Sequence, residues 1–221
     1  MKPLLITIDG PAGAGKTTAS RTLADRLNYK YIDTGALYRG VALAAISAGI
    51  SSDDDKRLEK LCRTLKMEFV SDGQELRLWL NDVDITEQIR TPEISMFASA
   101  VSARQVVRVY LLDLQREIGR AKGVVFEGRD MGTVVFPGAD VKFYLDASPK
   151  TRALRRYREL ETRTSQTLEE VESDMKRRDE NDSSRDLAPL KPAEDAINID
   201  STDLSIKAVV ELMLSSVAKA E

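Results

Sequence analysis

The residues with the clearest chemical meaning lie near the start of the chain, where Gly-Pro-Ala-Gly-Ala-Gly-Lys-Thr matches G-x-x-x-x-G-K-[ST] in full. Glycines let backbone N–H groups converge on phosphate oxygens, and the start of a following helix adds positive potential. We expect Lys16 to reach the β- and γ-phosphates and the Thr17 hydroxyl to bind Mg²⁺. The motif predicts a nucleoside triphosphate site, but it does not separate a kinase from a switch or a motor. The candidate donor-binding residues here are Gly10, Pro11, Ala12, Gly13, Ala14, Gly15, Lys16, Thr17 and Thr18.

A second polar segment, Asp33–Arg39, follows a predicted strand and opens a predicted helix. It supplies a carboxylate, a hydroxyl, a glycine, an aromatic ring and a guanidinium. Arg39 could hold an anion at the carboxyl edge of the sheet, where α/β proteins bind ligands. The alternative is an ordinary helix cap at Asp33 or Thr34 with a surface arginine, and the residues alone leave both interpretations open.

A third polar segment, Glu127–Thr133, follows the apolar run Val124–Glu127. Charged groups at the end of a buried strand are costly unless they meet a ligand, a metal or each other. We expect Arg129 and Asp130 to lie on an irregular loop and to point toward different parts of one ligand. A paired surface turn without function is the alternative, since arginine–carboxylate pairs are common on protein surfaces.

The later part of the chain is rich in arginine. For Arg152 and Arg163 we favour a solvated, salt-bridged helix face, because glutamates lie nearby. For Arg155, Arg156 and Arg158 we favour a mobile helical lid that closes over the donor phosphates and excludes water. Arg155 and Arg156 are therefore candidate donor-binding residues.

Five short apolar runs, continuous rather than alternating, are separated by helical stretches, which is typical of a parallel sheet covered on both faces. The predicted strands are Leu4–Ile8, Lys30–Ile32, Val124–Glu127, Val141–Leu145 and Ile197–Ile199. The predicted helices are Thr18–Leu27, Ala36–Ala48, Ala103–Arg120, Lys150–Leu160, one from the Thr167–Glu170 capping box to about Asp179, and Ile206–Ala218.

A different pattern occupies 67–85, where Met67–Val70, Glu75–Leu80 and Val83–Ile85 read as short antiparallel strands. Asp72-Gly73 and Asn81-Asp82 supply the turns. The sequence thus predicts an α/β P-loop NTPase fold. Its parts are a five-stranded parallel sheet flanked by helices, a small antiparallel β-insert and a helical lid.

Composition excludes several classes of protein. The 221 residues carry a net charge of -3, which argues against a nucleic-acid binder, and no apolar run is long enough for a membrane span. The start of the chain lacks the apolar core of a signal peptide. The single cysteine, Cys62, fits a reducing cytoplasm. Histidine is absent, so Ser-His and Cys-His catalysis and His-ligated metals are ruled out.

The three segments above and the late run Arg178-x-x-x-Asp182-x-x-Arg185-x-x-x-Pro189-Leu190 occur in this order along the chain. In this combination the chain resembles the bacterial cytidylate kinases, within the nucleoside monophosphate kinase family, over essentially its whole length. The β-insert resembles the one that separates those enzymes from adenylate kinases. Thr34 stands where serine is often found, and Glu127 where aspartate is often found.

The resemblance implies a role for each matching residue. In that family the acceptor phosphate is held by residues matching Arg39, Arg129 and Arg185. The cytosine ring is contacted by those matching Ser99, Arg108 and Asp130, and the ribose by those matching Arg178 and Asp182. Thr34 and Tyr38 would line the acceptor pocket. The candidate catalytic residues are Lys16, Asp33, Arg129 and Arg185.

The implied activity is ATP-dependent phosphorylation of CMP and dCMP to CDP and dCDP with Mg²⁺, by a monomer without nucleic-acid or membrane partners. Phosphoryl transfer between phosphates needs positioning and cations more than acid–base chemistry, which suits a chain without histidine. A kinase for UMP or another small acceptor, and a P-loop switch, are the alternatives. The expected division is a core at 1–33, an acceptor-binding region at 34–95 including the β-insert, core at 96–147, a lid at 148–165, and core at 166–221 with acceptor contacts at 178–185.

Overall fold

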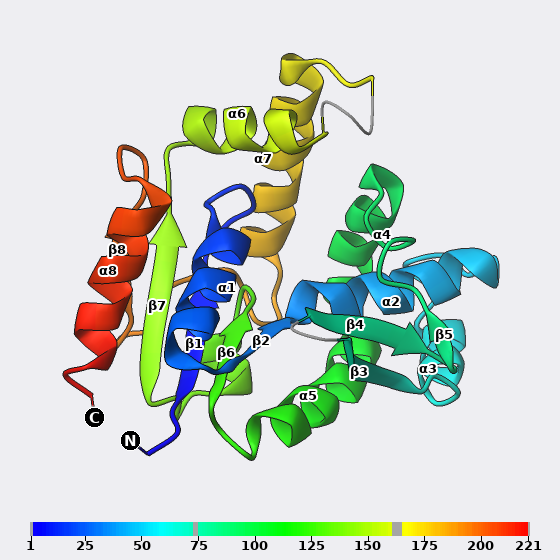
Figure 1. Cartoon of the computed structure of the whole chain (residues 1–221). Coiled ribbons are helices and arrows are strands. Elements are labelled where there is room, and N and C mark those ends of the chain that lie inside the picture. The colour runs from blue at the N-terminus through cyan, green and yellow to red at the C-terminus, as the bar shows by residue number, and fades with distance from the viewer. Residues whose placement is uncertain (1, 73–74, 161–164, 221) are drawn as a thin grey trace. The chain divides into compact units, whose positions relative to one another are not determined.

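Strand β1 (Leu5–Asp9) is buried along its whole length and lies at the centre of a five-stranded sheet in the computed structural model of this chain (Figure 1). Its parallel neighbours are β6 and β7, and β8 pairs in parallel with β7. The sheet therefore has the predicted α/β form, and each of the five strands predicted for it agrees with the structure to within one residue at either end. The other strands are β2 (Lys30–Asp33), β6 (Val124–Glu127), β7 (Val141–Asp146) and β8 (Ile197–Asp200).

The structure describes residues 2–72, 75–160 and 165–220. Two units compose the chain, the first formed by Met1–Tyr31 with Ala121–Glu221 and the second by Ile32–Arg120. The predicted turn residue Gly73 and the predicted surface residue Arg163 lie outside the described residues. No described helix is long and apolar enough to cross a membrane.

Helices α1 (Lys16–Leu27) and α8 (Ile206–Val217) pack against each other and against the sheet of the first unit (Figure 1). Their apolar faces join the strands in one core that includes Ile8, Leu23 and Met213. Helix α1 ends where Asn28 takes a left-handed conformation, with φ of 55°, and its N–H bonds the last carbonyls. The core thus fixes the beginning of α1 against the end of β1, where the glycine-rich loop lies.

Helices α6 (Pro149–Leu160) and α7 (Leu168–Ser184) pack side by side in the same unit (Figure 1). The capping box predicted at the start of α7 is present, with Thr167 and Glu170 bonding each other's backbone N–H groups. Helix α7 continues to Ser184, beyond the predicted end near Asp179, and this extra length brings Asp182 into its last turn.

The segment that follows β6 is more ordered than the predicted irregular loop. Residues Met131–Val135 form a single π-helical turn, η1, in which the Asp130 carbonyl accepts hydrogen bonds from the N–H groups of both Val134 and Val135. Such π-turns occur often at functional sites. Arg129 and Asp130 themselves lie on irregular backbone, as predicted, and the helical turn that follows them was not predicted from the sequence.

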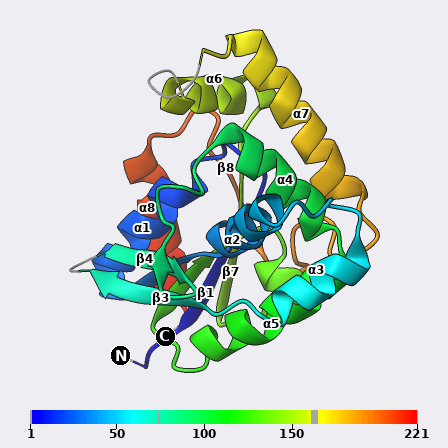
Figure 2. The same ribbon diagram turned by 90° about the vertical axis from the view of Figure 1, so that its right-hand side faces the viewer.

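In the second unit, helix α2 (Thr34–Ser47) lies at the centre and contacts every neighbouring layer (Figure 2). Around it lie α3 (Asp55–Cys62), α4 (Pro92–Ser102), α5 (Gln105–Gly119) and the predicted antiparallel sheet, formed by β3 (Met67–Asp72), β4 (Glu75–Leu80) and β5 (Val83–Asp84). Leu78 is 1% exposed and packs into the core of this unit together with Cys62.

Leu78→Ala is expected to lower the free energy of unfolding by about 2–5 kcal/mol, because it leaves a cavity where β4 meets α2. Urea unfolding followed by the fluorescence of Trp79, the only tryptophan of the chain, measures this loss directly. The control, Val109→Ala, removes a side chain that is 58% exposed and should change the free energy by less than about 0.5 kcal/mol. Equal effects of the two substitutions would contradict the packing described here.

Candidate active site

The glycine-rich loop follows a path that side chains would block at two positions. Gly10 has a φ of 142°, and a Cβ there would lie 2.0 Å from the Leu145 carbonyl oxygen. Gly13 has a φ of 73°, and its Cβ would lie 2.7 Å from the carbonyl oxygen of Arg152. The loop leads directly into α1, whose first residue is Lys16. Backbone N–H groups at a helix start are thereby available for an anion, as predicted.

Lys16 is only 4% exposed, and its Nζ donates a hydrogen bond of 2.6 Å to the Pro11 carbonyl oxygen within the same loop. Burial, helped by the charge of Arg129, lowers the pKa of Lys16 to about 7, although Glu127 and Asp9 favour its charged form. A bound phosphate would supply the missing negative charge. The lysine is therefore held at the position from which it can neutralise a ligand's phosphates.

A hydrogen-bonded group of oxygens surrounds Glu127, which is 8% exposed at the end of β6. The Thr17 hydroxyl donates to its Oε1 at 3.0 Å, and the Tyr31 hydroxyl donates to its Oε2 at 2.6 Å. A hydroxyl beside a carboxylate is a suitable partial ligand set for Mg²⁺, which prefers hard oxygens. Within the described part of the chain, no three carboxylate or cysteine side chains could hold a metal by themselves. Phosphate oxygens and waters would complete the coordination of an ion held here.

Asp182 lies among three arginines in the first unit and is 3% exposed. Its carboxylate oxygens lie 3.2 Å from Arg129 Nε, 3.9 Å from Arg178 Nε and 3.9 Å from Arg185 Nη1. Burial raises the pKa of Asp182, but the three guanidinium groups outweigh it and hold the pKa below its usual range. The predicted acceptor residues of α7 and of the segment after β6 are thus gathered in one cluster.

The same cluster includes Asp130, which is 2% exposed and whose Oδ1 lies 3.8 Å from Arg185 Nη2. Arg185 also donates from Nε to the Ala188 carbonyl at 2.6 Å, which fixes its direction. Asp130 and Asp182 together supply two negative charges against the three guanidinium groups around them. The cluster therefore keeps one positive charge in excess, which favours an anionic ligand.

In the second unit, the Asp33 side chain caps α2 by accepting a hydrogen bond from the Ala36 N–H. Asp33 also pairs with Arg39 Nη2 at 2.7 Å. The cap alternative is therefore confirmed for Asp33, while the Arg39 side chain is only 20% exposed and is not an ordinary surface arginine. Thr34, the first residue of α2, is buried.

The remaining acceptor candidates of this unit are linked to one another. Arg108 Nη1 donates to the Ser102 carbonyl at 3.0 Å, and its guanidinium lies 5.7 Å from the ring centre of Tyr38. The Ser102 hydroxyl in turn donates to the Ser99 carbonyl at 2.7 Å. The buried Ser99 hydroxyl has no hydrogen-bond partner among the described residues. Buried hydroxyls normally have a partner, so Ser99 is suited to bind a ligand.

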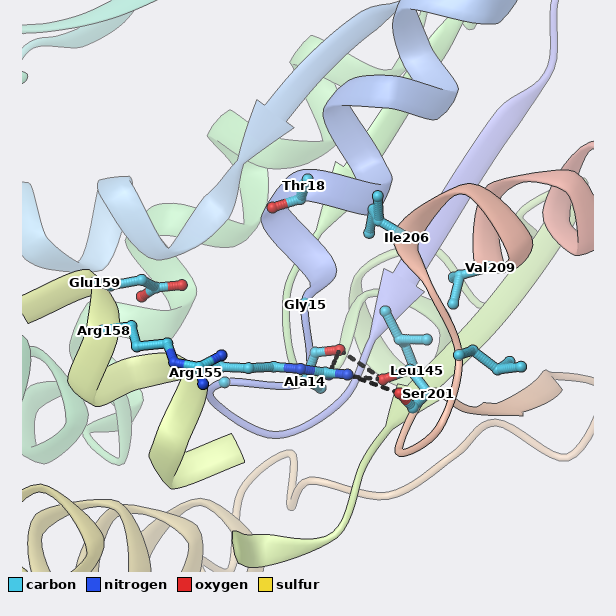
Figure 3. A pocket seen from close by; sticks show the side chains of 12 residues that line it. Ala14, Gly15, Thr18, Leu145, Arg155, Arg158, Glu159, Ser201, Ile206 and Val209 are labelled. Carbon is cyan, nitrogen blue, oxygen red and sulfur yellow. Dashed lines mark hydrogen bonds between the residues drawn. The ribbon is translucent and has the colours of Figure 1, made fainter. Parts of the chain in front are cut away.

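A pocket of about 390 Å³ opens beside the glycine-rich loop (Figure 3). Leu145, Ile206 and Val209 form an apolar wall, and Arg155 extends across the pocket toward Ala14 and Ser201. Arg155 donates to the Ala14 carbonyl and to the Ser201 hydroxyl at 3.3 Å and 3.0 Å. The structure thus places Arg155 at the loop, together with Thr18 and Arg158.

Two further arginines of α6 are not among the residues that line this pocket. Arg156 pairs with Glu159 on its own helix and does not line this pocket. Arg152, predicted to lie on a solvated face, is 7% exposed and donates to the Ala12 carbonyl at 3.1 Å and to Asp179 at 2.6 Å. That prediction was wrong, because Arg152 lies on the face of α6 that packs against the glycine-rich loop.

Sequence reasoning missed three residues of this site: Asp9, Tyr31 and Ser201. Asp9 carried a usable signal, because it is a charged residue at the end of a buried strand, the same pattern that drew attention to Glu127. Tyr31 and Ser201 gave none, since their partners lie 96 and 187 residues away along the chain.

Comparison with known proteins agrees with this geometry. The cytidylate kinase family model matches residues 6–219. A cytidylate kinase of Geobacter sp. (strain M21) is 53% identical over 95% of this chain and 91% of its own length. A cytidylate kinase of Geobacter sulfurreducens is 52% identical over 99% of this chain and 94% of its own length. The crystal structure of a gluconokinase from Sinorhizobium meliloti 1021 superimposes with a TM-score of 0.51 at 16% identity, covering 99% of this chain and 93% of that one, and supports the fold alone.

A glycine-rich phosphate loop at the end of a central parallel strand, with a second arginine-rich site in the same unit, defines a P-loop phosphotransferase of the nucleoside monophosphate kinase class. The chain belongs to the cytidylate kinase family.

Binding of ATP at about pH 8 is expected to take up ~1 proton per site. In the free protein this pH lies above the lowered pKa of Lys16, and the phosphates raise that pKa again. At about pH 6 the lysine is already charged, so the uptake through Lys16 should disappear. Calorimetric titration in buffers of different ionisation enthalpy measures the proton number.

Lys16→Met is the matched control for this measurement. It should show no such uptake, and its rate of phosphoryl transfer should fall on the order of 10²–10³-fold. The same proton number in both proteins would assign the uptake to another group and contradict the role given to Lys16.

Proposed function

We propose that this chain transfers the γ-phosphoryl group of ATP to CMP, and also to dCMP, to form CDP and dCDP. The observation that carries the proposal is the buried cluster in which Arg129, Arg178 and Arg185 surround Asp182, with Arg185 also close to Asp130. A P-loop alone requires no such second anion site. Membership of the cytidylate kinase family supports the choice of acceptor.

For the donor, we assign the triphosphate of ATP to the glycine-rich loop and Lys16, and its base to the adjacent pocket. The apolar wall and the Arg155 and Arg158 side chains suit a flat heteroaromatic ring, because guanidinium planes stack on such rings. Arg156 stays a predicted donor contact that would need to leave Glu159. Lid closure by α6 would exclude water and suppress hydrolysis of ATP.

Mg²⁺ is assigned to Thr17 and, directly or through water, to Glu127, because their oxygens are adjacent at the loop. Bound there with the phosphates, the ion would neutralise charge on the transferred group. The chain's own contribution is to hold these oxygens in place, and Tyr31 fixes the second oxygen of Glu127.

For the acceptor, we keep the roles implied by the family resemblance. Arg39, Arg129 and Arg185 would bind the phosphate, Arg178 and Asp182 the ribose, and Ser99, Arg108 and Asp130 the cytosine, with Thr34 and Tyr38 lining the pocket. The unpartnered Ser99 hydroxyl and the orientation of Arg108 by Ser102 support this assignment. Asp33 would act by holding Arg39 in position.

Phosphoryl transfer to CMP needs little acid–base catalysis. The phosphate of CMP is already a nucleophile at neutral pH, so the protein must align it with the γ-phosphate and neutralise the spreading charge. Lys16 at the donor and Arg129 and Arg185 at the acceptor supply cations for this purpose.

We further propose that the protein works as a monomer in the cytoplasm. The only cysteine, Cys62, is buried in the second unit and cannot form an internal disulfide, which suits a reducing compartment.

The proposal is tested by ATP consumption with a panel of nucleoside monophosphates. CMP and dCMP are expected to stimulate ADP formation strongly, and UMP, AMP and GMP much less. Slow hydrolysis of ATP that none of the acceptors stimulates would indicate a switch. A preference for UMP would contradict the assignment of CMP as the acceptor.

Asp130→Ala is expected to reduce kcat/KM for CMP on the order of 10–150-fold, the equivalent of about 1.5–3 kcal/mol for a lost hydrogen bond to a charged group. A carboxylate only accepts hydrogen bonds, so Asp130 favours the cytosine amino group and disfavours the uracil O4. The fall for UMP should be much smaller, and the CMP/UMP ratio should narrow. Any weakening of the contact with Arg185 affects both substrates and cancels in this ratio.

Arg129→Ala is the matched comparison, because CMP and UMP carry the same phosphate. It should weaken both substrates alike and leave their ratio unchanged. If Asp130→Ala also leaves the ratio unchanged, Asp130 has no part in base recognition.

A further inference from the structure

Asp9 is a buried carboxylate to which the functions assigned above give no contact with a substrate. It is the last residue of β1, directly before Gly10, and it is 3% exposed. Its Oδ1 accepts a hydrogen bond of 2.9 Å from the Met131 N–H, and its Oδ2 accepts one of 2.8 Å from the Gly132 N–H. Both oxygens are thus committed to the first two residues of η1.

These bonds fix the segment that carries the acceptor candidates. Gly128 N–H bonds to the Ile8 carbonyl at 3.1 Å, so the segment is tied to β1 before Arg129 and, through Asp9, after Asp130. Arg129 and Asp130 therefore lie between two anchors on the same strand. That strand continues without interruption into the phosphate loop.

The turn approaches β1 closely at Gly132, beside Asp9. A Cβ on Gly132 would lie 3.1 Å from Lys142 Cδ, 3.2 Å from Thr7 Oγ1 and 3.4 Å from Asp9 Oδ2. Glycine therefore allows η1 to approach β1 closely enough for both hydrogen bonds to form. A side chain at this position would be tighter than an ordinary contact, so Lys142, Thr7 or the turn itself would have to shift.

Charged groups of both the donor site and the acceptor site lie near Asp9. Burial raises the pKa of Asp9 to about 6, its two backbone hydrogen bonds lower it, Asp130 raises it and Lys16 lowers it. The other ionisable groups nearby are Tyr144 on β7, whose pKa Asp9 helps to raise, and Lys142, whose Nζ is bound to Asp195. Asp9 is therefore ionised at neutral pH and loses its charge in mild acid.

We propose that Asp9 is a positioning residue that couples the two substrate sites: its carboxylate holds the backbone of Met131 and Gly132 so that Arg129 and Asp130 face CMP at a fixed distance from the phosphate loop. The proposal depends on the acceptor roles assigned above to Arg129 and Asp130. Asp9 itself touches neither substrate.

The test is Asp9→Asn, which keeps the shape but turns one oxygen into an amide group that cannot accept. The KM for CMP is expected to rise on the order of ten-fold, whereas the Kd for ATP alone changes by less than about three-fold. The ratio of wild-type to variant kcat/KM for CMP should fall toward one below about pH 6, where the wild-type carboxyl is protonated. The titration of CMP itself cancels in that ratio.

Gly132→Ala provides a second variant that leaves the charge of Asp9 in place. It should raise the KM for CMP in the same selective way and increase hydrogen exchange at the Met131 amide, even if Asp9→Asn folds poorly. Equal effects on CMP and ATP in both variants, or a pH-independent ratio with Asp9→Asn, would overturn the proposal.

Asp140→Asn is the matched control. Asp140 also accepts a backbone N–H of β1, from Leu5 at 2.7 Å, but at the opposite end of the strand, where it pairs with Lys122. It should lower the free energy of unfolding without a selective effect on the KM for CMP over the Kd for ATP. Its ratio of wild-type to variant kcat/KM should not change with pH.

Arg129→Ala tests the proposed acceptor site separately from the proposed role of Asp9. If this substitution leaves CMP use intact, the proposed acceptor site is wrong. If it impairs CMP use and Asp9→Asn does not, only the role of Asp9 is rejected.

Discussion

The ammonium group of Lys16, buried beneath the phosphate loop, is the constraint on which the first unit depends. An isolated buried charge is strongly unfavourable, so neighbouring groups must compensate for it. Asp9 and Glu127 supply part of the compensating negative charge, from the ends of β1 and β6. Both carboxylates are fixed in position, because Asp9 accepts hydrogen bonds from the π-turn and Glu127 accepts them from Thr17 and Tyr31. The compensation of one charge thus orders most of the donor site.

In the acceptor cluster, a buried negative charge is compensated by positive charges around it. Asp182 is buried, and only the three guanidinium groups around it keep it ionised. Because each arginine is held by a carboxylate or a carbonyl, little side-chain entropy is left to lose when a phosphate binds. Preorganised cations act more strongly on a transition state than cations that must be gathered during the reaction.

The positions of the five sheet strands and of the six predicted helices followed from the sequence pattern, because the central strands are continuous apolar runs and the helices carry caps such as Thr167. The P-loop followed from spacing alone. By contrast, the burial of Arg152 and the roles of Tyr31 and Ser201 depend on partners far away along the chain, which no local pattern encodes. The π-turn after Asp130 was missed for a similar reason, since it is stabilised by the Asp9 carboxylate, 122 residues from Met131.

The order of the two units along the chain has a consequence for biosynthesis. The second unit is one continuous stretch, whereas β1 must wait for both of its sheet partners, β6 and β7, which come after that stretch. On the ribosome, the second unit can close while β1 is still without neighbours. An unpaired apolar strand is prone to aggregation. The brevity of β1, and the polar Thr7 and Asp9 within it, limit that exposure until the sheet is complete.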